Sequence, residues 1–317
     1  MKYYPSFFFF MIMIIMSLFM VFSSTNWFML WLSMETALLG FLPLFNYTNS
    51  EETMTLIKYF ILQSSGSILF LAGLITSNSS LFMSGLLMKL GLFPFFFWVP
   101  SVLKSISWAG ILMLTTLQKL PAMGVLISPP LPLQTNFMFM VSVISILISS
   151  ILGFNQSNIR MLMAYSSISQ TAYMLISLMT SAKLFLLYFF NYLITMSLLI
   201  YIINKNNVST MEDLSDEFSG TMNLLFMNLM GMPPFPMFFM KMFLLFSVMN
   251  LNQYPVSSYM IILCAMSTVF MYMNMIMSSS IKNFKSKDLT LNWMAILTMM
   301  ILSLASVKMT TMMTFGW

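Results

Sequence analysis

The chain has 317 residues, of which 59% are hydrophobic and 7% are charged, and its formal net charge is +5. A soluble domain carries about 25% charged residues, so this composition excludes a water-soluble enzyme, a DNA-binding module and a disordered chain. Since roughly 20 apolar residues cross a bilayer, about eleven spans with short loops fill the sequence. The composition therefore predicts an all-α integral membrane protein, with residues 1–317 forming a single membrane domain.

Apolar runs separated by short polar segments mark the expected spans. They should be helices, because backbone polar groups in lipid must find their hydrogen bonds within the segment. The first run has no cleavage site of the A-x-A type and more apolar sequence follows it directly, so we interpret it as a span rather than a signal peptide. The predicted spans are Phe7–Val21, Trp27–Phe45, Met54–Ile75, Leu81–Val99, Trp108–Ile127, Asn136–Phe154, Met161–Thr180, Leu184–Ile203, Met222–Met249, Ser257–Ser278 and Leu291–Val307.

Basic residues between the spans predict the orientation, because such residues concentrate on the cytosol-like side of a membrane. Two of them, Lys183 and Lys308, lie on one side. The other side holds Lys2, Lys58, Lys104, Arg160, Lys205, Lys282, Lys285 and Lys287. The N-terminus is therefore expected to face the cytosol-like or matrix-like compartment.

Several kinds of chemistry are disfavoured by what the sequence lacks. There is one cysteine, Cys264, and no histidine, which leaves no disulfide framework and no Cys/His metal site. No glycine-rich phosphate loop occurs. The basic residues form no patch for nucleic acid. We therefore expect no metal and no cofactor in this chain, and any redox chemistry must take place in a partner.

Four ionisable residues fall inside predicted spans: Glu35, Lys89, Lys119 and Lys241. A lysine at the centre of a membrane helix costs about 2.5–3.5 kcal/mol, so these side chains are expected to face the bundle interior or a wet cavity and to pair. Two alternatives are open. A lysine near a helix end can reach the headgroups, and Glu35 can make a structural hydrogen bond to another helix.

Prolines interrupt two of the spans. Pro94 and Pro100 follow Lys89, and Pro233, Pro234 and Pro236 precede Lys241. Proline breaks a helix, and broken membrane helices are tolerated where they line a cavity. The interrupted spans are the fourth and the ninth, which predicts two inverted five-helix repeats, residues 1–127 and 136–278, followed by a C-terminal helix at 291–307. Such a pair of interruptions points to a transport path.

Proton movement is the chemistry that suits this arrangement. Burial favours the neutral form of a lysine and a nearby carboxylate favours its charged form, so a lysine can switch charge state when its partner changes. We expect Glu35 to modulate Lys89. Polar side chains that could hold water along the path are Gln118, Tyr165, Ser166, Ser167 and Gln170. The alternative for these is ordinary hydrogen bonding between helices.

Five segments in order carry a resemblance: WFMLWLSMETALLGFLPL, MKLGLFPFFFWVPSVL, LTTLQKLPAM, LGFNQSNIRMLMAYSSISQTAYM and GMPPFPMFFMKM. Together they resemble the subunit 2 family of mitochondrial NADH:ubiquinone oxidoreductase, respiratory complex I, over about residues 20–250. The resemblance implies an antiporter-like fold in the proton-pumping membrane arm of the mitochondrial inner membrane, with the N-terminus in the matrix.

The family's intramembrane glutamate and its three lysines fall on Glu35, Lys89, Lys119 and Lys241. The resemblance also implies that the chain works within a proton-translocating enzyme beside other membrane-arm subunits and lipids. NADH, flavin, iron–sulfur clusters and ubiquinone would be bound elsewhere in that enzyme.

The sequence departs from the family pattern at three places. In one segment, Phe96 and Ser101 stand where a histidine and a glutamate are common. Gln170 stands where a histidine is frequent, and a basic pair is reduced to Arg160 followed by Met161. Two alternatives to a proton-translocating subunit stay open. A stand-alone cation/proton antiporter would have the same charged line. A purely structural spacer would tolerate the missing histidines.

Overall fold

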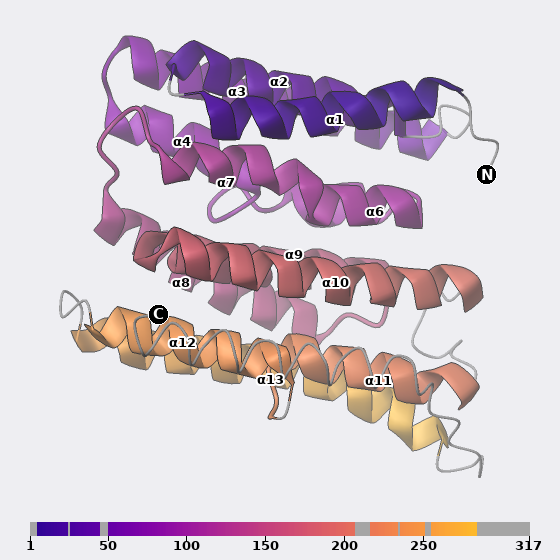
Figure 1. The fold of residues 1–317 in the computed structure, drawn as a ribbon. Helices are drawn as coiled ribbons and strands as arrows, with labels where there is room; N and C mark the ends of the chain where they lie inside the picture. The colour runs from indigo at the N-terminus through magenta and orange to yellow at the C-terminus, as the bar shows by residue number, and fades with distance from the viewer. Residues whose placement is uncertain are drawn as a thin grey trace. The chain divides into compact units, whose positions relative to one another are not determined.

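The computed structural model describes residues 5–24, 26–44, 50–206, 216–233, 235–250 and 255–283. Within these ranges the chain forms helices joined by turns, and no strand (Figure 1). The predicted span at 291–307 and Pro234 lie outside the described residues. The chain divides into two compact units, Met1–Ser145 and Ile146–Trp317.

In the first unit, α1 packs on α2 and on α7, and α3 packs on α4 and α5. Two short 3-10 helices occur among the α-helices: η1 follows α2, and η2 lies between α6 and α7. The helices of this unit are α1 (Pro5–Ser23), α2 (Trp27–Phe41), η1 (Leu42–Leu44), α3 (Ser50–Ile75), α4 (Ser79–Leu90), α5 (Trp98–Leu103), α6 (Trp108–Thr115), η2 (Leu117–Lys119) and α7 (Leu120–Ile127).

The unit boundary falls within α8 (Thr135–Phe154). In the second unit, α10 contacts α9, α11 and α12, and α13 packs on α11 and α12. Its helices after α8 are α9 (Ile159–Thr180), α10 (Ala182–Asn206), α11 (Asp216–Met230), α12 (Pro236–Asn250) and α13 (Pro255–Asn283).

Five helical segments among the described residues are long and apolar enough to cross a membrane. They are Glu52–Ile75, Trp108–Ile127, Thr135–Phe154, Ala182–Asn206 and Ser258–Met277. Other apolar helices are shorter. A helix of 15 residues such as α12 rises about 22 Å, which is less than the roughly 30 Å of a hydrocarbon core. Such a helix needs its neighbour across a break to complete a crossing.

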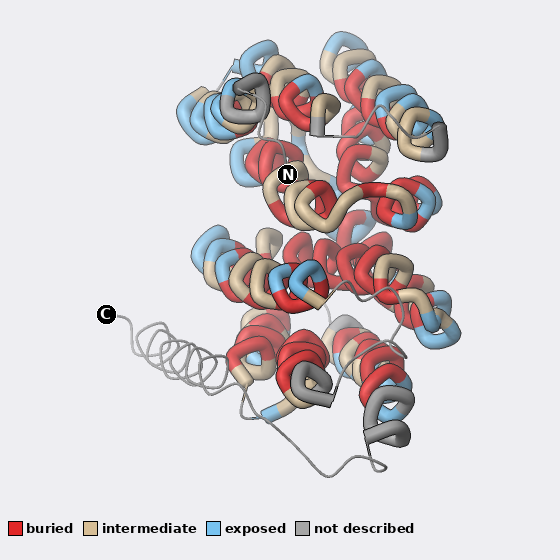
Figure 2. Tube along the Cα trace, turned by 90° about the vertical axis from the view of Figure 1, so that its right-hand side faces the viewer, coloured by how far each residue is buried: buried red, intermediate tan, exposed pale blue. Residues whose placement is uncertain are grey.

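Most helices have a buried side and an exposed side (Figure 2). The exposed sides carry large apolar residues, among them Phe19, Ile68, Phe190 and Phe270, each more than half exposed. An apolar exposed surface suits lipid rather than water. The chain is therefore a multi-pass membrane protein.

Small residues let α3 and α4 approach closely. A Cβ on Gly85 of α4 would lie 2.6 Å from the backbone nitrogen of Phe70 and 2.7 Å from the carbonyl oxygen of Gly66, both on α3. Close backbone approach at small residues is the usual way in which membrane helices pack without a hydrophobic driving force between them. This contact fixes the helix that carries Lys89.

We expect Gly85→Ala to destabilise the fold by about 1–3 kcal/mol, the cost of overpacking a tight contact. The added methyl group meets backbone atoms, which cannot rotate away. The measurement is the thermal unfolding midpoint of the purified assembly. Ser84→Ala, at a half-buried neighbouring position on α4, is the control. Equal midpoints for the two variants would contradict the close packing.

The first helix break follows α4. Gly91 adopts φ +69 and ends the helix. The Leu92 N–H donates to the carbonyl of Leu87 (3.1 Å), and the Phe95 N–H donates to the carbonyl of Leu92 (2.7 Å). Only glycine takes a positive φ at little cost, so Gly91 is what allows the chain to turn here.

The second break follows α11 and has the same hydrogen-bond pattern. Gly231 adopts φ +82. The Met232 N–H donates to the carbonyl of Met227 (3.2 Å), and the Phe235 N–H donates to the carbonyl of Met232 (2.9 Å). Counted from the glycine, donors and acceptors stand at the same positions in both breaks. Each unit therefore contains one break of the same local design.

Candidate functional site

The site in the first unit is built around a buried pair of opposite charges. The Lys89 Nζ lies 3.6 Å from the Glu35 Oε1, and the side chains are 5% and 22% exposed. Lys89 lies in the last turn of α4 and Glu35 in the middle of α2. Among the described residues, neither of these two atoms makes a direct hydrogen bond. The contact is therefore an ion pair and not a hydrogen bond, and both atoms can still form a hydrogen bond to another group.

Two glutamines flank this pair. The Gln63 Nε2 of α3 donates to the carbonyl of Lys89 (3.4 Å), and the Gln118 Nε2 donates to the carbonyl of Ala37 on α2 (2.8 Å). A small cavity lies between them, lined by Met34, Ala37, Leu38, Gln63, Lys89, Gln118, Pro121 and Ala122. Its volume of about 10 Å³ is close to the minimum for one water molecule. Three polar side chains from three helical segments, Gln63 of α3, Lys89 of α4 and Gln118 of η2, therefore line the same cavity.

The segment that holds Lys119 is a third interruption, which the sequence analysis did not predict. The expected span Trp108–Ile127 contains α6, the 3-10 turn η2 and α7. Pro121 explains the irregularity, because its missing N–H and its ring disrupt bonding to the carbonyl four residues earlier. Lys119 is 4% exposed at the end of η2. It lies next to Gln118, so η2 brings both residues into the interior.

In the second unit, Lys241 of α12 reaches back to the end of α11. Its Nζ donates to the carbonyls of Met230 (2.8 Å) and Leu229 (3.4 Å) and to the Thr268 Oγ1 of α13 (3.4 Å). It also lies 5.0 Å from the centroid of the Tyr173 ring. The last carbonyls of a helix lack partners within it and carry partial negative charge, which suits an ammonium group.

The three buried lysines do not reach outwards in this fold. Lys89 and Lys241 are each 8% exposed over the whole residue, and Lys119 is 4% exposed. Headgroup contact would require their side chains to lie on the outside of a helix end. The geometry therefore favours interior roles over the alternative in which these lysines reach the headgroups.

The predicted secondary polar residues fall into two kinds. The hydroxyls of Ser166 and Ser167 donate to carbonyls of their own helix, those of Met163 and Ala164. Tyr165 is partly exposed. The side chain of Gln170 links helices instead: its Nε2 donates to the carbonyl of Leu229 (3.3 Å), and its Oε1 accepts from the Tyr188 hydroxyl.

The prolines differ in their positions. Pro94 lies within the first break, and Pro233 within the second. Pro236 is the first residue of α12, where a missing N–H is harmless. Pro100 lies in the first turn of α5, after the first interruption. The first interruption spans residues 91–97.

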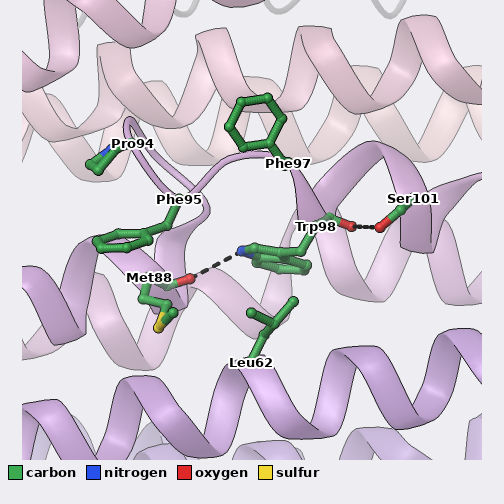
Figure 3. A pocket seen from close by; sticks show the side chains of 7 residues that line it. All are labelled: Leu62, Met88, Pro94, Phe95, Phe97, Trp98 and Ser101. Atoms are coloured by element: carbon green, nitrogen blue, oxygen red, sulfur yellow. Dashed lines mark hydrogen bonds between the residues drawn. The ribbon is translucent and has the colours of Figure 1, made fainter.

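Beside the first break lies a larger, mainly apolar pocket (Figure 3). It has a volume of about 320 Å³ and is lined by Leu62, Met88, Pro94, Phe95, Phe97, Trp98 and Ser101. The Trp98 indole N–H donates to the carbonyl of Met88 (3.1 Å), and the Ser101 hydroxyl donates to the carbonyl of Trp98 (2.8 Å). These bonds satisfy backbone groups at the break, so Ser101 has a local structural partner here.

Several buried polar side chains at these sites were not predicted from the sequence. Gln63 is 6% exposed in the first unit, and Thr268 is fully buried in the second. Three buried tyrosines near Lys241 were also not singled out: Tyr173, Tyr188 and Tyr272. All five are polar residues within apolar stretches, and that is the sequence signal that could have identified them.

The comparisons with known proteins first define the class. The family described as "NADH:quinone oxidoreductase/Mrp antiporter, TM" matches residues 74–264. A subunit in the structure of respiratory complex I from Thermus thermophilus with bound aureothin superposes with a TM-score of 0.77 at 17% identity, covering 86% of this chain and 70% of that one. The fold is that of the antiporter-like membrane proteins.

Curated relatives narrow the class to a family. NADH-ubiquinone oxidoreductase chain 2 of Lumbricus terrestris is 32% identical over 305 residues, which cover 87% of this chain and 89% of the relative. The Mytilus edulis protein of the same name is 37% identical over 219 residues, covering 67% and 68% of the two chains. The chain belongs to the NADH-ubiquinone oxidoreductase chain 2 family, and the family predicted from its motifs is confirmed.

Proposed function

We propose that this chain is a core membrane-arm subunit of the mitochondrial NADH:ubiquinone oxidoreductase and takes part in proton translocation. It would lie in the inner membrane beside other membrane-arm subunits and lipids. NADH oxidation and ubiquinone reduction would occur elsewhere in the enzyme, where NADH, flavin, iron–sulfur clusters and ubiquinone bind. Membership of the family supports this assignment.

The observation that carries the proposal is the Glu35–Lys89 pair at the first helix break. A membrane protein retains a buried ion pair at considerable cost, and such pairs mark ion and proton pathways. Lys89 lines a cavity of about 10 Å³, which is close to the minimum for one water. Lys89 can therefore exchange a proton with water while its charge state responds to Glu35.

The path we propose continues through the other two lysines. Lys119 follows Gln118, a lining residue of the cavity, and Lys241 lies at the second break. Gln170 and the nearby residues of α9 would hold water or orient backbone groups along this path. The chain itself performs no bond chemistry beyond proton transfer, and a change of charge in a neighbouring subunit would drive the transfer.

The two breaks also support the proposed organisation. Their shared hydrogen-bond pattern is what two inverted five-helix repeats, residues 1–127 and 136–278, would produce, with eleven spans in total. The excess of basic residues on the N-terminal side of the spans supports an N-terminus in the matrix.

Lys119→Met tests this function. The substitution keeps an unbranched apolar stem and removes the only group at this position that can carry a proton. In sealed inner-membrane vesicles, we expect proton translocation per NADH oxidised to fall while the enzyme still assembles. Lys104→Met, at an exposed position, is the control and should behave as the unaltered enzyme.

An unchanged proton yield in tightly coupled Lys119→Met vesicles would overturn the role of Lys119. Unchanged yields at all three lysines would favour a structural spacer. Cation/proton exchange by the purified chain alone would favour a stand-alone antiporter. These outcomes separate the three functions that the sequence leaves open.

A further inference from the structure

Three buried tyrosines lie in the interior of the second unit, and one of them, Tyr173, contacts Lys241. Tyr173 of α9, Tyr188 of α10 and Tyr272 of α13 are each at most 1% exposed. We refer to these three residues as the tyrosine cluster. They come from three different helices, so the fold, and not a local sequence motif, gathers them.

Tyr173 contacts the lysine directly, and Tyr188 is linked to the second break through Gln170. The ring of Tyr173 lies under the Lys241 Nζ, at 5.0 Å from its centroid to the nitrogen. Tyr173 stacks on Tyr188 with ring centroids 6.3 Å apart. The Tyr188 hydroxyl donates to the Gln170 Oε1, and the Gln170 Nε2 donates to the carbonyl of Leu229, which also accepts from Lys241.

Two hydroxyls of the cluster have hydrogen-bonding capacity that the described residues do not use. The Tyr173 hydroxyl lies beside Thr268, and the Tyr272 hydroxyl beside Ser166 and Gln170. Neither hydroxyl makes a direct hydrogen bond within the described part of the chain. A buried hydroxyl without a partner is costly. Phenylalanine would fill nearly the same volume without that cost, so packing alone does not explain these hydroxyls.

The side-chain amide of Gln170 cannot replace the hydroxyls of Tyr173 and Tyr272 as a proton carrier. Its oxygen accepts from Tyr188 and its nitrogen donates to Leu229, which fixes its orientation. An amide held at both ends orders its neighbours but does not exchange protons. A tyrosine hydroxyl, in contrast, can both donate and accept a hydrogen bond.

We propose that the hydroxyls of Tyr173 and Tyr272 are proton-path groups that connect Lys241, through bound water, to the interior of the second unit. This inference rests on the proposed function. A water accepts a proton from the ammonium group, the hydroxyl oxygen accepts one from that water, and the hydroxyl releases its own proton onward. The hydroxyl is neutral before and after, and no oxidation or reduction takes place.

Tyr173→Phe, Tyr272→Phe and the double variant test the proposal in the assembled enzyme in sealed vesicles. Each removes one oxygen atom and keeps the ring. We expect proton-coupled turnover to slow about tenfold, the effect of losing one hydrogen bond in the path. We also expect assembly and thermal stability to be unchanged or improved. Tyr201→Phe, at a position that is 66% exposed, is the matched control.

Lys241→Met, measured in parallel, distinguishes a failure of the tyrosine proposal from a failure of the proposed function. If Lys241→Met lowers the proton yield but the tyrosine variants do not slow turnover, the tyrosine proposal is overturned and the proposed function stands. If Lys241→Met leaves the yield unchanged, the role of Lys241 is overturned, together with the connection of the tyrosines to it. Loss of thermal stability in Tyr173→Phe would show that its hydroxyl has a structural partner, and would also count against the proposal.

Discussion

Lys89→Met is expected to abolish most proton-coupled turnover. Methionine matches the length of the lysine stem, so packing at the end of α4 is retained while the charge is lost. The carboxylate of Glu35 then stays in the interior without its partner. Breaking a buried ion pair costs about 3–5 kcal/mol. Because the Glu35 side chain is 22% exposed, we expect a cost at the lower end of this range, about 3 kcal/mol.

A double variant distinguishes the stability effect from the effect on function. Combining Lys89→Met with Glu35→Gln removes both charges, so thermal stability should recover towards that of the unaltered enzyme. Proton translocation should not recover, because neither position of the ion pair can then carry a charge. Glu35→Gln alone is expected to have a smaller effect, since Glu35 tunes its partner. The measurements are the unfolding midpoint and the protons translocated per NADH oxidised.

Normal translocation by the double variant would contradict the proposed role of the pair and would make it a structural contact. Lys58→Met is the control, because Lys58 is an exposed lysine on α3. It should change neither stability nor proton yield.

Gly231→Ala is expected to impair the second break in two ways. A residue with a Cβ pays roughly 1–2 kcal/mol in the left-handed region, and Gly231 has φ +82. The new Cβ would also lie 3.0 Å from the Lys241 Cδ and 3.4 Å from its Nζ. We therefore expect a lower unfolding midpoint together with a loss of proton yield.

Gly231→Asn separates the two causes. Asparagine tolerates the left-handed region better than alanine, but it too places a Cβ against Lys241. If crowding of the lysine is what matters, the asparagine variant should be more stable than the alanine variant and equally poor in translocation. Recovery of translocation in the asparagine variant would show that backbone strain, and not the position of Lys241, accounts for the loss.

The sequence reveals the membrane class, the family and the two proline-associated breaks, because each depends on local composition. Pro94 and Pro233 lie within the interruptions, as their chemistry predicts. The interruption before α7 was missed, although Pro121 explains it in the same terms.

The sites are less accessible from sequence, because their members are distant along the chain. Glu35 and Lys89 are 54 residues apart and come from different helices. The pairing of Gln170 with Tyr188, and the approach of Thr268 to Lys241, depend on how three or four helices pack. Periodicity indicates which face of a helix is apolar, but not which polar groups from several helices meet.

The hydrogen bonds that Lys241 can donate depend on whether its side chain is charged. An ammonium group has three N–H bonds, and its three acceptors are the Leu229 carbonyl, the Met230 carbonyl and the Thr268 hydroxyl. A neutral amine has two hydrogens for the same three oxygens. When the proton leaves, either one oxygen is released or the Thr268 hydroxyl turns and donates to the lone pair of the amine. Loss of the charge on this lysine therefore changes the hydrogen bonding at the second break as well as the charge there.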